Sequence, residues 1–198
     1  MKQQLLIATR NKHKKKEIQE IIDGLNIELL GLDDVDELPE IIEDGQTFEE
    51  NAIKKASVTA KLTGITTLAD DSGLVVDVLS GQPGIYSARF AGLNADDEKN
   101  NQKLLGMMDQ VDQDQRTARF VCVVALATPE GKTQTVEGRC EGKIATNPHG
   151  ADGFGYDPLF IPEGFEQSFA QLGADAKNLI SHRGIALAAI RPILEALR

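Results

Sequence analysis

Two long runs of β-forming residues, at 118–128 and 133–145, are the feature that most constrains the fold of this chain. Pro129-Glu130-Gly131 lies between them, and such residues are typical of the tight turn of a β-hairpin. Hairpin strands run antiparallel, so the sheet that contains them is predicted to be at least partly antiparallel. An entirely parallel sheet is thereby excluded.

Before this hairpin, predicted strands and helices alternate. Strands are expected at 5–8, 65–69 and 74–79, and helices from about residue 12, over 47–64 and over 95–108. Thr47 and Glu50 predict a capping box at the start of the second helix, and Gly64 stands where that helix should end. Residues 33–44 form an acidic loop with a short extended piece at 40–42.

After the hairpin, a short strand is expected at 159–161 and a last helix from about Ser181. The last helix should turn a stripe of apolar side chains inward, namely Leu187, Ile190, Leu194 and Leu197. The whole pattern predicts an α/β fold, a mixed β-sheet flanked by helices. Function is expected in a cleft where the two halves of the chain meet.

Composition limits the function classes. The 198 residues include 31 acidic and 21 basic side chains, a net charge of −10, which argues against a surface that coats nucleic acid. No stretch approaches the roughly 18 apolar residues of a membrane span. Cys122 and Cys140 are the only cysteines, and their spacing matches no metal or redox motif. We therefore expect a cytoplasmic protein with reduced thiols and no membrane partner.

Four lysines and a histidine crowd the start of the first predicted helix: Lys12, His13, Lys14, Lys15 and Lys16. A helix N-terminus is already electropositive, so each exposed lysine there opposes the helix dipole by about 0.3–1 kcal/mol. A bound polyanion would reverse the sign of this interaction, as phosphates do at helix N-termini. The alternative is a solvated basic face, and this cluster alone favours neither.

Asp70-Asp71-Ser72-Gly73 is the strongest chemical feature and is predicted at a strand end. Successive strand residues point to opposite sides, so one carboxylate should face the cleft while the other turns into the fold. A carboxylate placed there suits Mg²⁺, which prefers few protein oxygens together with waters and phosphates. The alternative is an Asx-turn that ends the strand. Glu43 and Asp44 are candidates for a second carboxylate, although acidic loops are usually only solvated.

A third group of candidates lies toward the C-terminus. Phe154-Gly155-Tyr156-Asp157 follows further glycines, and an aromatic ring beside such a loop can stack on a nucleobase. Lys177, His182 and Arg183 could contact a phosphate or the carbonyl edge of a base. The alternatives are aromatic rings that pack in the core and a surface His182 beside a capping Ser181. Together the three groups match the phosphate, metal and base of a nucleotide.

Six motifs in order resemble the inosine/xanthosine triphosphate pyrophosphatase family, which hydrolyses non-canonical purine nucleoside triphosphates. They are Thr9-x-Asn11-x-x-Lys14-x-x-Glu17; Thr47-Phe48-x-Glu50-Asn51-Ala52 with Lys55; Ala69-Asp70-Asp71-Ser72-Gly73-Leu74; Pro83-Gly84-Ile85-Tyr86-Ser87-Ala88-Arg89; Gly153-Phe154-Gly155-Tyr156-Asp157-Pro158; and Ser181-His182-Arg183-Gly184. They span nearly the whole chain.

The resemblance implies one pyrophosphatase domain over 1–198, an elongated mixed sheet in two lobes with the active-site cleft between them. It implies hydrolysis of ITP, dITP and XTP to the monophosphate and pyrophosphate, with Mg²⁺ as cofactor, usually by a homodimer. Asp71 would be the catalytic base and, with Glu43, would hold the metal. The implied substrate-binding residues are Thr9, Arg10, Asn11, Lys12, His13, Lys14, Lys55, Ser72, Phe154, Gly155, Tyr156, Asp157, Lys177, His182 and Arg183.

Two alternatives to this function are considered. One is a pyrophosphatase for other modified nucleotides, such as modified pyrimidine triphosphates. The other is a sensor that binds nucleotides through the same residues without turnover. Arg10 and His13 stand where many members of the family have small residues, and this leaves the geometry of the phosphate loop open.

Overall fold

A computed structural model of the chain describes residues 3–22 and 24–196. Its strands are β1 (Gln3–Ile7), β2 (Ile27–Gly31), β3 (Thr67–Val76), β4 (Thr117–Ala127), β5 (Thr133–Ile144) and β6 (Phe160–Pro162). Its α-helices are α1 (Lys12–Ile22), α2 (Phe48–Thr63), α3 (Asp97–Met107), α4 (Phe169–Leu172), α5 (Ala174–Ile180) and α6 (His182–Glu195). Leu197 and the side chains of Ile21 and Ile22 lie outside the described residues.

The six strands form one mixed sheet in the order β2-β1-β3-β4-β5-β6. Strand β1 runs parallel to β2 and β3, whereas β5 and β6 are antiparallel. The helix α1 connects β1 to β2, as expected for a parallel crossover. The α/β class, the mixed sheet and the two long neighbouring strands β4 and β5 confirm the prediction from the sequence.

The chain divides into two compact units. The first unit comprises 1–71, 122–138 and 183–198, and the second comprises 72–121 and 139–182. Strands β3, β4 and β5 contribute residues to both units. The single domain of two lobes with a cleft between them stays a prediction.

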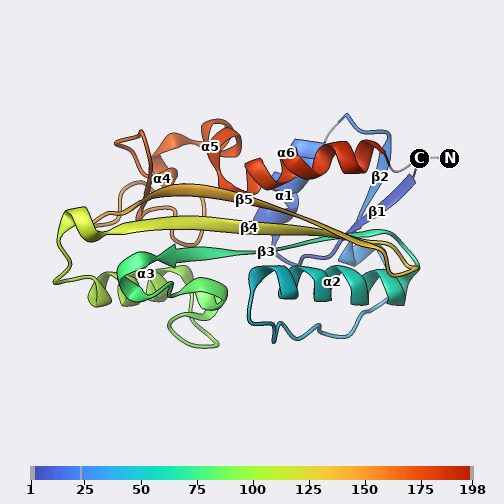
Figure 1. Cartoon of the computed structure of the whole chain (residues 1–198), viewed down its shortest axis with the longest axis horizontal. Coiled ribbons are helices and arrows are strands. Elements are labelled where there is room, and N and C mark those ends of the chain that lie inside the picture. Colours follow the sequence, from blue (N-terminus) through green and yellow to red (C-terminus); the bar gives the residue numbers. More distant parts are fainter. Residues whose placement is uncertain (1–2, 23, 197–198) are drawn as a thin grey trace. The chain divides into compact units, whose positions relative to one another are not determined.

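In the first unit, helices cover both faces of the sheet (Figure 1). Residues of β4 alternate between two hydrophobic clusters because successive strand side chains point to opposite faces. Leu126 packs with Ile18 of α1 and Leu187 of α6 in one cluster. Ala125 packs in the other cluster with an alanine stripe of α2, namely Ala52, Ala56 and Ala60. Because both surfaces in this second cluster are built from alanines, the helix can approach the sheet closely.

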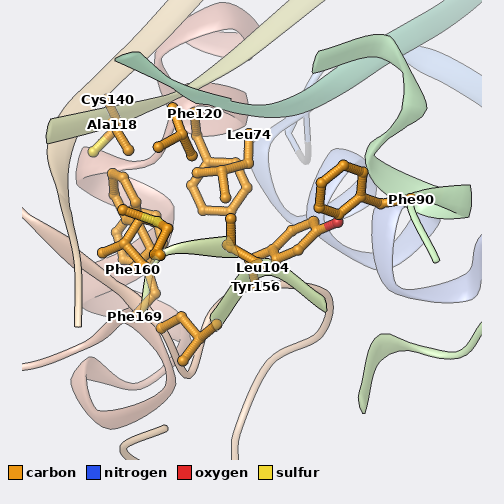
Figure 2. Close-up of a cluster of buried hydrophobic side chains, with 13 residues drawn as sticks. Leu74, Phe90, Leu104, Ala118, Phe120, Cys140, Tyr156, Phe160 and Phe169 are labelled. Carbon is orange, nitrogen blue, oxygen red and sulfur yellow. The ribbon is translucent and has the colours of Figure 1, made fainter. Parts of the chain in front are cut away.

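The second unit has an aromatic core, shown in Figure 2. The Phe120 ring meets the Phe160 ring edge-on at a centroid distance of 4.8 Å, and Phe160 lies 5.0 Å from Phe169. Leu104 of α3 and Tyr156 belong to the same cluster. Packing in this core therefore holds α3 against the segment that contains Phe154.

The structure corrects the expected strand ends around the acid pair. A break at Asp70–Gly73 and a second strand over 74–79 were predicted, but β3 is continuous from Thr67 to Val76. A short 3₁₀ helix, Asp77–Leu79, takes the place of the second strand's end. Each carboxylate of the pair has hydrogen-bonding partners on its own face, so the strand can bury both and continue. The alternative of an Asx-turn that ends the strand is excluded for the same reason.

Smaller differences concern caps and short elements. The Thr47 hydroxyl accepts a hydrogen bond from the Glu50 N–H, as predicted, but the Glu50 carboxylate accepts from the N–H of Gln46 rather than Thr47. Residues 40–42 form no strand. Strand β2 and the short helices α4 and α5 were not predicted. Within the described residues, no helix is both long enough and apolar enough to cross a membrane.

Candidate active site

Asp70 and Asp71 are the centre of a group of buried charges in the first unit. Neighbours in a strand point to opposite faces, and these two side chains accordingly meet different helices. Their side chains are 1% and 9% exposed. We call this group the charged cluster: Lys14, Glu17, Glu43, Asn51, Lys55, Asp70, Asp71 and Arg183.

Asp70 is held by two cations. Its Oδ2 atom lies 2.9 Å from Lys14 Nζ and accepts hydrogen bonds from Arg183 Nε at 3.3 Å and Nη2 at 3.2 Å. Arg183 also donates to Glu17. Burial by itself would raise the pKa of Asp70, but Lys14 and Arg183 hold this pKa well below its usual range. Asp70 is therefore ionised throughout the neutral pH range.

Asp71 has the opposite electrostatic character. Its Oδ2 atom accepts a hydrogen bond from Asn51 Nδ2 at 3.0 Å, and its Oδ1 atom lies 4.0 Å from Lys55 Nζ. Burial raises the pKa of Asp71 above its ordinary value despite the lowering effects of Lys55 and Asn51. A carboxylate with a raised pKa binds a proton more readily, which suits a general base.

Lys55 lies between three oxygen-bearing groups. Its ammonium is 2.8 Å from Glu43 Oε1 and donates to the main-chain carbonyl of Asp70 at 2.6 Å. Burial by itself would lower the pKa of Lys55, but Asp70, Asp71 and Glu43 together raise it. The spacing of Asn51 and Lys55, one turn apart on α2, thus brings an amide and a cation to the acid pair.

The charged cluster also fits a divalent cation. No set of three or more His, Cys, Asp and Glu side chains suited to a metal occurs among the described residues. Mg²⁺ does not need one, because it commonly uses one or two carboxylates with water and substrate phosphates. Glu43 and Asp71 converge on the Lys55 ammonium. The oxygens therefore suit a hard cation.

The structure separates the lysines that the sequence groups together. Lys14 reaches Asp70, whereas Lys16 lies 3.7 Å from Glu20 on the same helix and Lys12 is exposed. The Asn11 side chain accepts hydrogen bonds from the N–H groups of His13 and Lys14, so it caps α1. Thr9 in turn accepts from the Asn11 N–H. Arg10 and His13 are exposed beside this cap.

The second unit contains the other candidate group, which we call the aromatic loop, residues 153–157. Asp157 Oδ2 accepts a hydrogen bond from the Phe154 N–H at 2.9 Å and lies 2.7 Å from Lys177 Nζ. The same ammonium lies 4.8 Å from the centre of the Phe154 ring. Phe154 is half-buried, whereas Asp157 and Lys177 are buried. The loop thus presents one aromatic ring beside a fixed cation.

Other predicted site residues lie in the core. Tyr156 is 4% exposed, belongs to the aromatic core shown in Figure 2, and donates its hydroxyl to the Ser87 carbonyl at 2.8 Å. The His182 ring stacks on Phe120 at 4.6 Å. For Tyr156, the structure shows the core packing that was considered as an alternative. His182 is buried, so the alternative of a surface histidine is wrong. Ser72 is half-buried and follows Asp71 in β3.

Sequence reasoning assigned no role to Asp70, Glu17 or Asn51, although all three belong to the charged cluster. Glu17 stands three residues after Lys14, so both lie on one face of α1, and this spacing was the available signal. Asp70 was visible only as the neighbour of Asp71. Arg183 was expected at the edge of a base, and the structure places its guanidinium between Asp70 and Glu17.

Comparisons with known proteins identify the family of this chain. The Ham1 family matches residues 5–193. The chain is 54% identical to the dITP/XTP pyrophosphatase of Geobacter sulfurreducens over 94% of both chains, and 50% identical to that of Desulforamulus reducens over 98% of this chain and 96% of the other. It also resembles the structure of the Staphylococcus aureus Ham1 protein, with a TM-score of 0.89, 38% identity and coverage of 99% of this chain and 100% of the other. The chain belongs to the Ham1 family.

Proposed function

We propose that this protein hydrolyses the non-canonical purine nucleoside triphosphates ITP, dITP and XTP to the monophosphate and pyrophosphate. The observation that supports this most directly is the buried acid pair. Asp71 has a raised pKa and lies beside Lys55, while Asp70 fixes Lys14 and Arg183. A carboxylate that can accept a proton from water, surrounded by fixed cations, is suited to the hydrolysis of a negatively charged triphosphate. The names of the Geobacter and Desulforamulus relatives support the same substrate class.

Asp71 would accept a proton from the water that attacks the α-phosphorus. The bond between that phosphorus and the oxygen bridging the α- and β-phosphates breaks, and the departing pyrophosphate takes the electron pair. Lys14 and Lys55 would stabilise the charge that develops on the phosphates, because fixed cations are effective where water is excluded. The loop from Thr9 to Lys14, which leads into α1, would hold the phosphates together with Lys55.

Mg²⁺ is the cofactor in this proposal, with Glu43 and Asp71 as its protein ligands. A bound divalent cation would neutralise negative charge on the triphosphate. The convergence of both carboxylates on the Lys55 ammonium supports this choice, because the same oxygens suit a hard cation.

The base would stack on Phe154, with Ser72 against the substrate and Asp157 and Lys177 near the base edge. His182 and Arg183 were also expected at that edge, but the His182 ring stacks on Phe120 and the Arg183 guanidinium is held by Asp70 and Glu17. Hypoxanthine and xanthine present a carbonyl at position 6, where adenine presents an amino group. Hydrogen-bond donors at that edge would lack acceptors with adenine, and such mismatches discriminate strongly.

We further propose a homodimer acting in the cytoplasm, where nucleoside triphosphates are used. The expectation of no nucleic-acid or membrane partner stays a prediction.

Turnover of ITP, XTP, GTP, ATP and a modified pyrimidine triphosphate, with and without Mg²⁺, tests the proposal, with products separated chromatographically. We expect Mg²⁺-dependent release of pyrophosphate and a large preference for ITP over ATP. Equal turnover of ITP and ATP would refute the assignment of the base edge. Preference for a modified pyrimidine triphosphate would instead identify the alternative pyrophosphatase. Thermal stabilisation by ITP without Mg²⁺-dependent turnover would identify a sensor.

A further inference from the structure

Helix α3 contacts the aromatic loop through its first and second turns, and the two contacts meet at one residue, Gly155. Asp97 Oδ2 accepts a hydrogen bond from the Gly155 N–H at 2.6 Å. Asn101 Nδ2 donates to the Gly155 carbonyl at 3.0 Å. Asp97 and Asn101 are four residues apart, so they lie on one face of the helix. One face of α3 therefore holds both polar groups of the residue that follows Phe154.

Gly155 lies in a turn. Its φ angle is +62°, a region that glycine enters readily, and the Asp157 N–H donates to the Phe154 carbonyl at 3.3 Å across it. The other polar contacts in the loop belong to its neighbours, since Asp157 holds the Phe154 N–H and the Tyr156 hydroxyl reaches Ser87. Asp97 and Asn101 thus add to a set of hydrogen bonds that holds Phe154 and the two residues after it.

Asn101 is poorly explained by stability alone. Its Oδ1 atom is buried and has no hydrogen-bond partner among the described residues, and a buried polar atom without a partner is unfavourable. A leucine or methionine would fill the same space without that penalty. The contact that the asparagine does make is with the Gly155 carbonyl. This contact is the one that an apolar side chain could not replace.

We propose that Asp97 and Asn101 are positioning residues that fix the Phe154 ring for stacking on the purine base. Neither side chain is assigned to the substrate in the proposed function, and the inference rests on that function. Loss of either hydrogen bond should let the loop move and weaken base binding, while Asp71, Lys14 and Lys55 remain intact in the other unit. Such a change raises KM and leaves kcat nearly unchanged.

The test uses four variants of the full chain with ITP as substrate. Asp97→Ala removes the acceptor, and Asn101→Asp replaces the donor with a carboxylate that faces the Gly155 carbonyl. Glu98→Ala and Gln102→Glu are the matched controls, because they make the same kinds of change at neighbouring exposed positions of α3. We expect KM to rise about tenfold for the first two and less than twofold for the controls, with kcat within about twofold throughout.

Two further measurements separate positioning from general damage. Inhibition by the product pyrophosphate, which has no base, should be unchanged in all four variants. Asp97→Asn retains an acceptor and should restore KM to near the wild-type value. Equal KM values for the Asp97 and Asn101 variants and their controls would overturn the inference while leaving the proposed function intact, and so would a parallel fall in kcat and in pyrophosphate affinity.

A loop measurement distinguishes failure of this inference from failure of the proposed function. Amide hydrogen exchange at Gly155 should be slow in the wild type and in Glu98→Ala, and faster in Asp97→Ala. If wild-type protein does not hydrolyse ITP, the proposed function is refuted, and the positioning of Phe154 for a purine falls with it. If ITP is hydrolysed but Gly155 exchanges equally in all proteins, only the positioning role is refuted.

Discussion

Asp70 and Asp71 are neighbours in one strand, yet their surroundings give them opposite properties. Asp70 meets Lys14 and Arg183, which lower its pKa, whereas burial raises the pKa of Asp71. When the pKa values of two adjacent carboxylates are shifted in opposite directions, one carboxylate can have a structural role and the other a catalytic role. Asp70 orders the cations, and Asp71 is left to take part in proton transfer in the proposed mechanism.

The substitution Asp71→Asn tests this division. Asparagine has nearly the same volume but neither the charge nor the proton affinity, so kcat for ITP should fall by at least about 100-fold, the lower range for general base catalysis. Steady-state pyrophosphate release measures the effect. Asp44→Asn is the control, because Asp44 is exposed and pairs with Lys54. Activity within about tenfold of the wild type would remove Asp71 from the mechanism.

The two cysteines give a second prediction at this scale. Burial raises the pKa of the Cys122 thiol to about 12 and that of Cys140 to about 11. Because the thiolate is the reactive form, only about one thiol in a thousand or fewer is reactive at pH 8. Native protein should react slowly with a disulfide reagent that releases a coloured thiol, and protein in guanidinium chloride should react at both cysteines. Rapid labelling of the folded protein would contradict the raised pKa values of the two thiols.

At the scale of elements, α2 and β3 build half of the charged cluster. The alanine stripe of α2 lets it lie close to the sheet, and Asn51 and Lys55 then meet the acid pair in β3. The helix is defined at both ends: Thr47 caps its N-terminus, and Gly64 adopts φ +70° at its C-terminus. Precise ends fix the register of the helix, and therefore the positions of both side chains.

Removing the N-terminal cap should weaken the helix measurably. Thr47→Ala eliminates the hydroxyl that accepts from the Glu50 N–H and should lower the free energy of unfolding by about 1 kcal/mol. For a protein of this length, that corresponds to a fall in Tm of about 2–4 °C, measured by circular dichroism. Thr47→Ser keeps the hydroxyl and should retain most of the stability. Equal losses in both variants would show that the cap is not the cause.

At the scale of the whole molecule, a net charge of −10 coexists with a site built around cations. Lys14, Lys55 and Arg183 are each paired with buried or half-buried carboxylates. The pairing lets these cations stay charged away from water, and it ties the stability of the fold to the ionisation of Asp70.

Acidification should reveal this linkage. Because the folded pKa of Asp70 lies below its unfolded value of about 3.9, its contribution to stability is complete above that value and is lost as the pH falls through the folded pKa. Asp70→Asn should therefore be destabilised by about 3–5 kcal/mol at pH 7, since it leaves buried cations unpaired. The difference in the free energy of unfolding between the wild type and Asp70→Asn should shrink below about pH 4.

Urea unfolding from pH 7 to pH 2 measures this difference. Asp114→Asn removes the same charge from an exposed position and serves as the control. A constant difference between wild type and Asp70→Asn across this pH range would contradict the depressed pKa of Asp70.

Local patterns in the sequence determined much of the fold. The capping residues Thr47 and Gly64 located α2, and the hairpin residues around Pro129 located β4 and β5, because caps and tight turns depend on a few adjacent residues. The motifs also identified the family and most members of both candidate groups. These are short-range properties, so they can be read without coordinates.

Only the tertiary structure decided which charges meet. Arg183 and Asp70 are 113 residues apart, and nothing local indicates that they pair or that the acid pair lies inside a continuous strand. The contact of Asp97 with Gly155 likewise joins distant segments through the packing of α3. Burial, and with it the opposite pKa shifts of Asp70 and Asp71, depends on long-range packing that residue types alone do not specify.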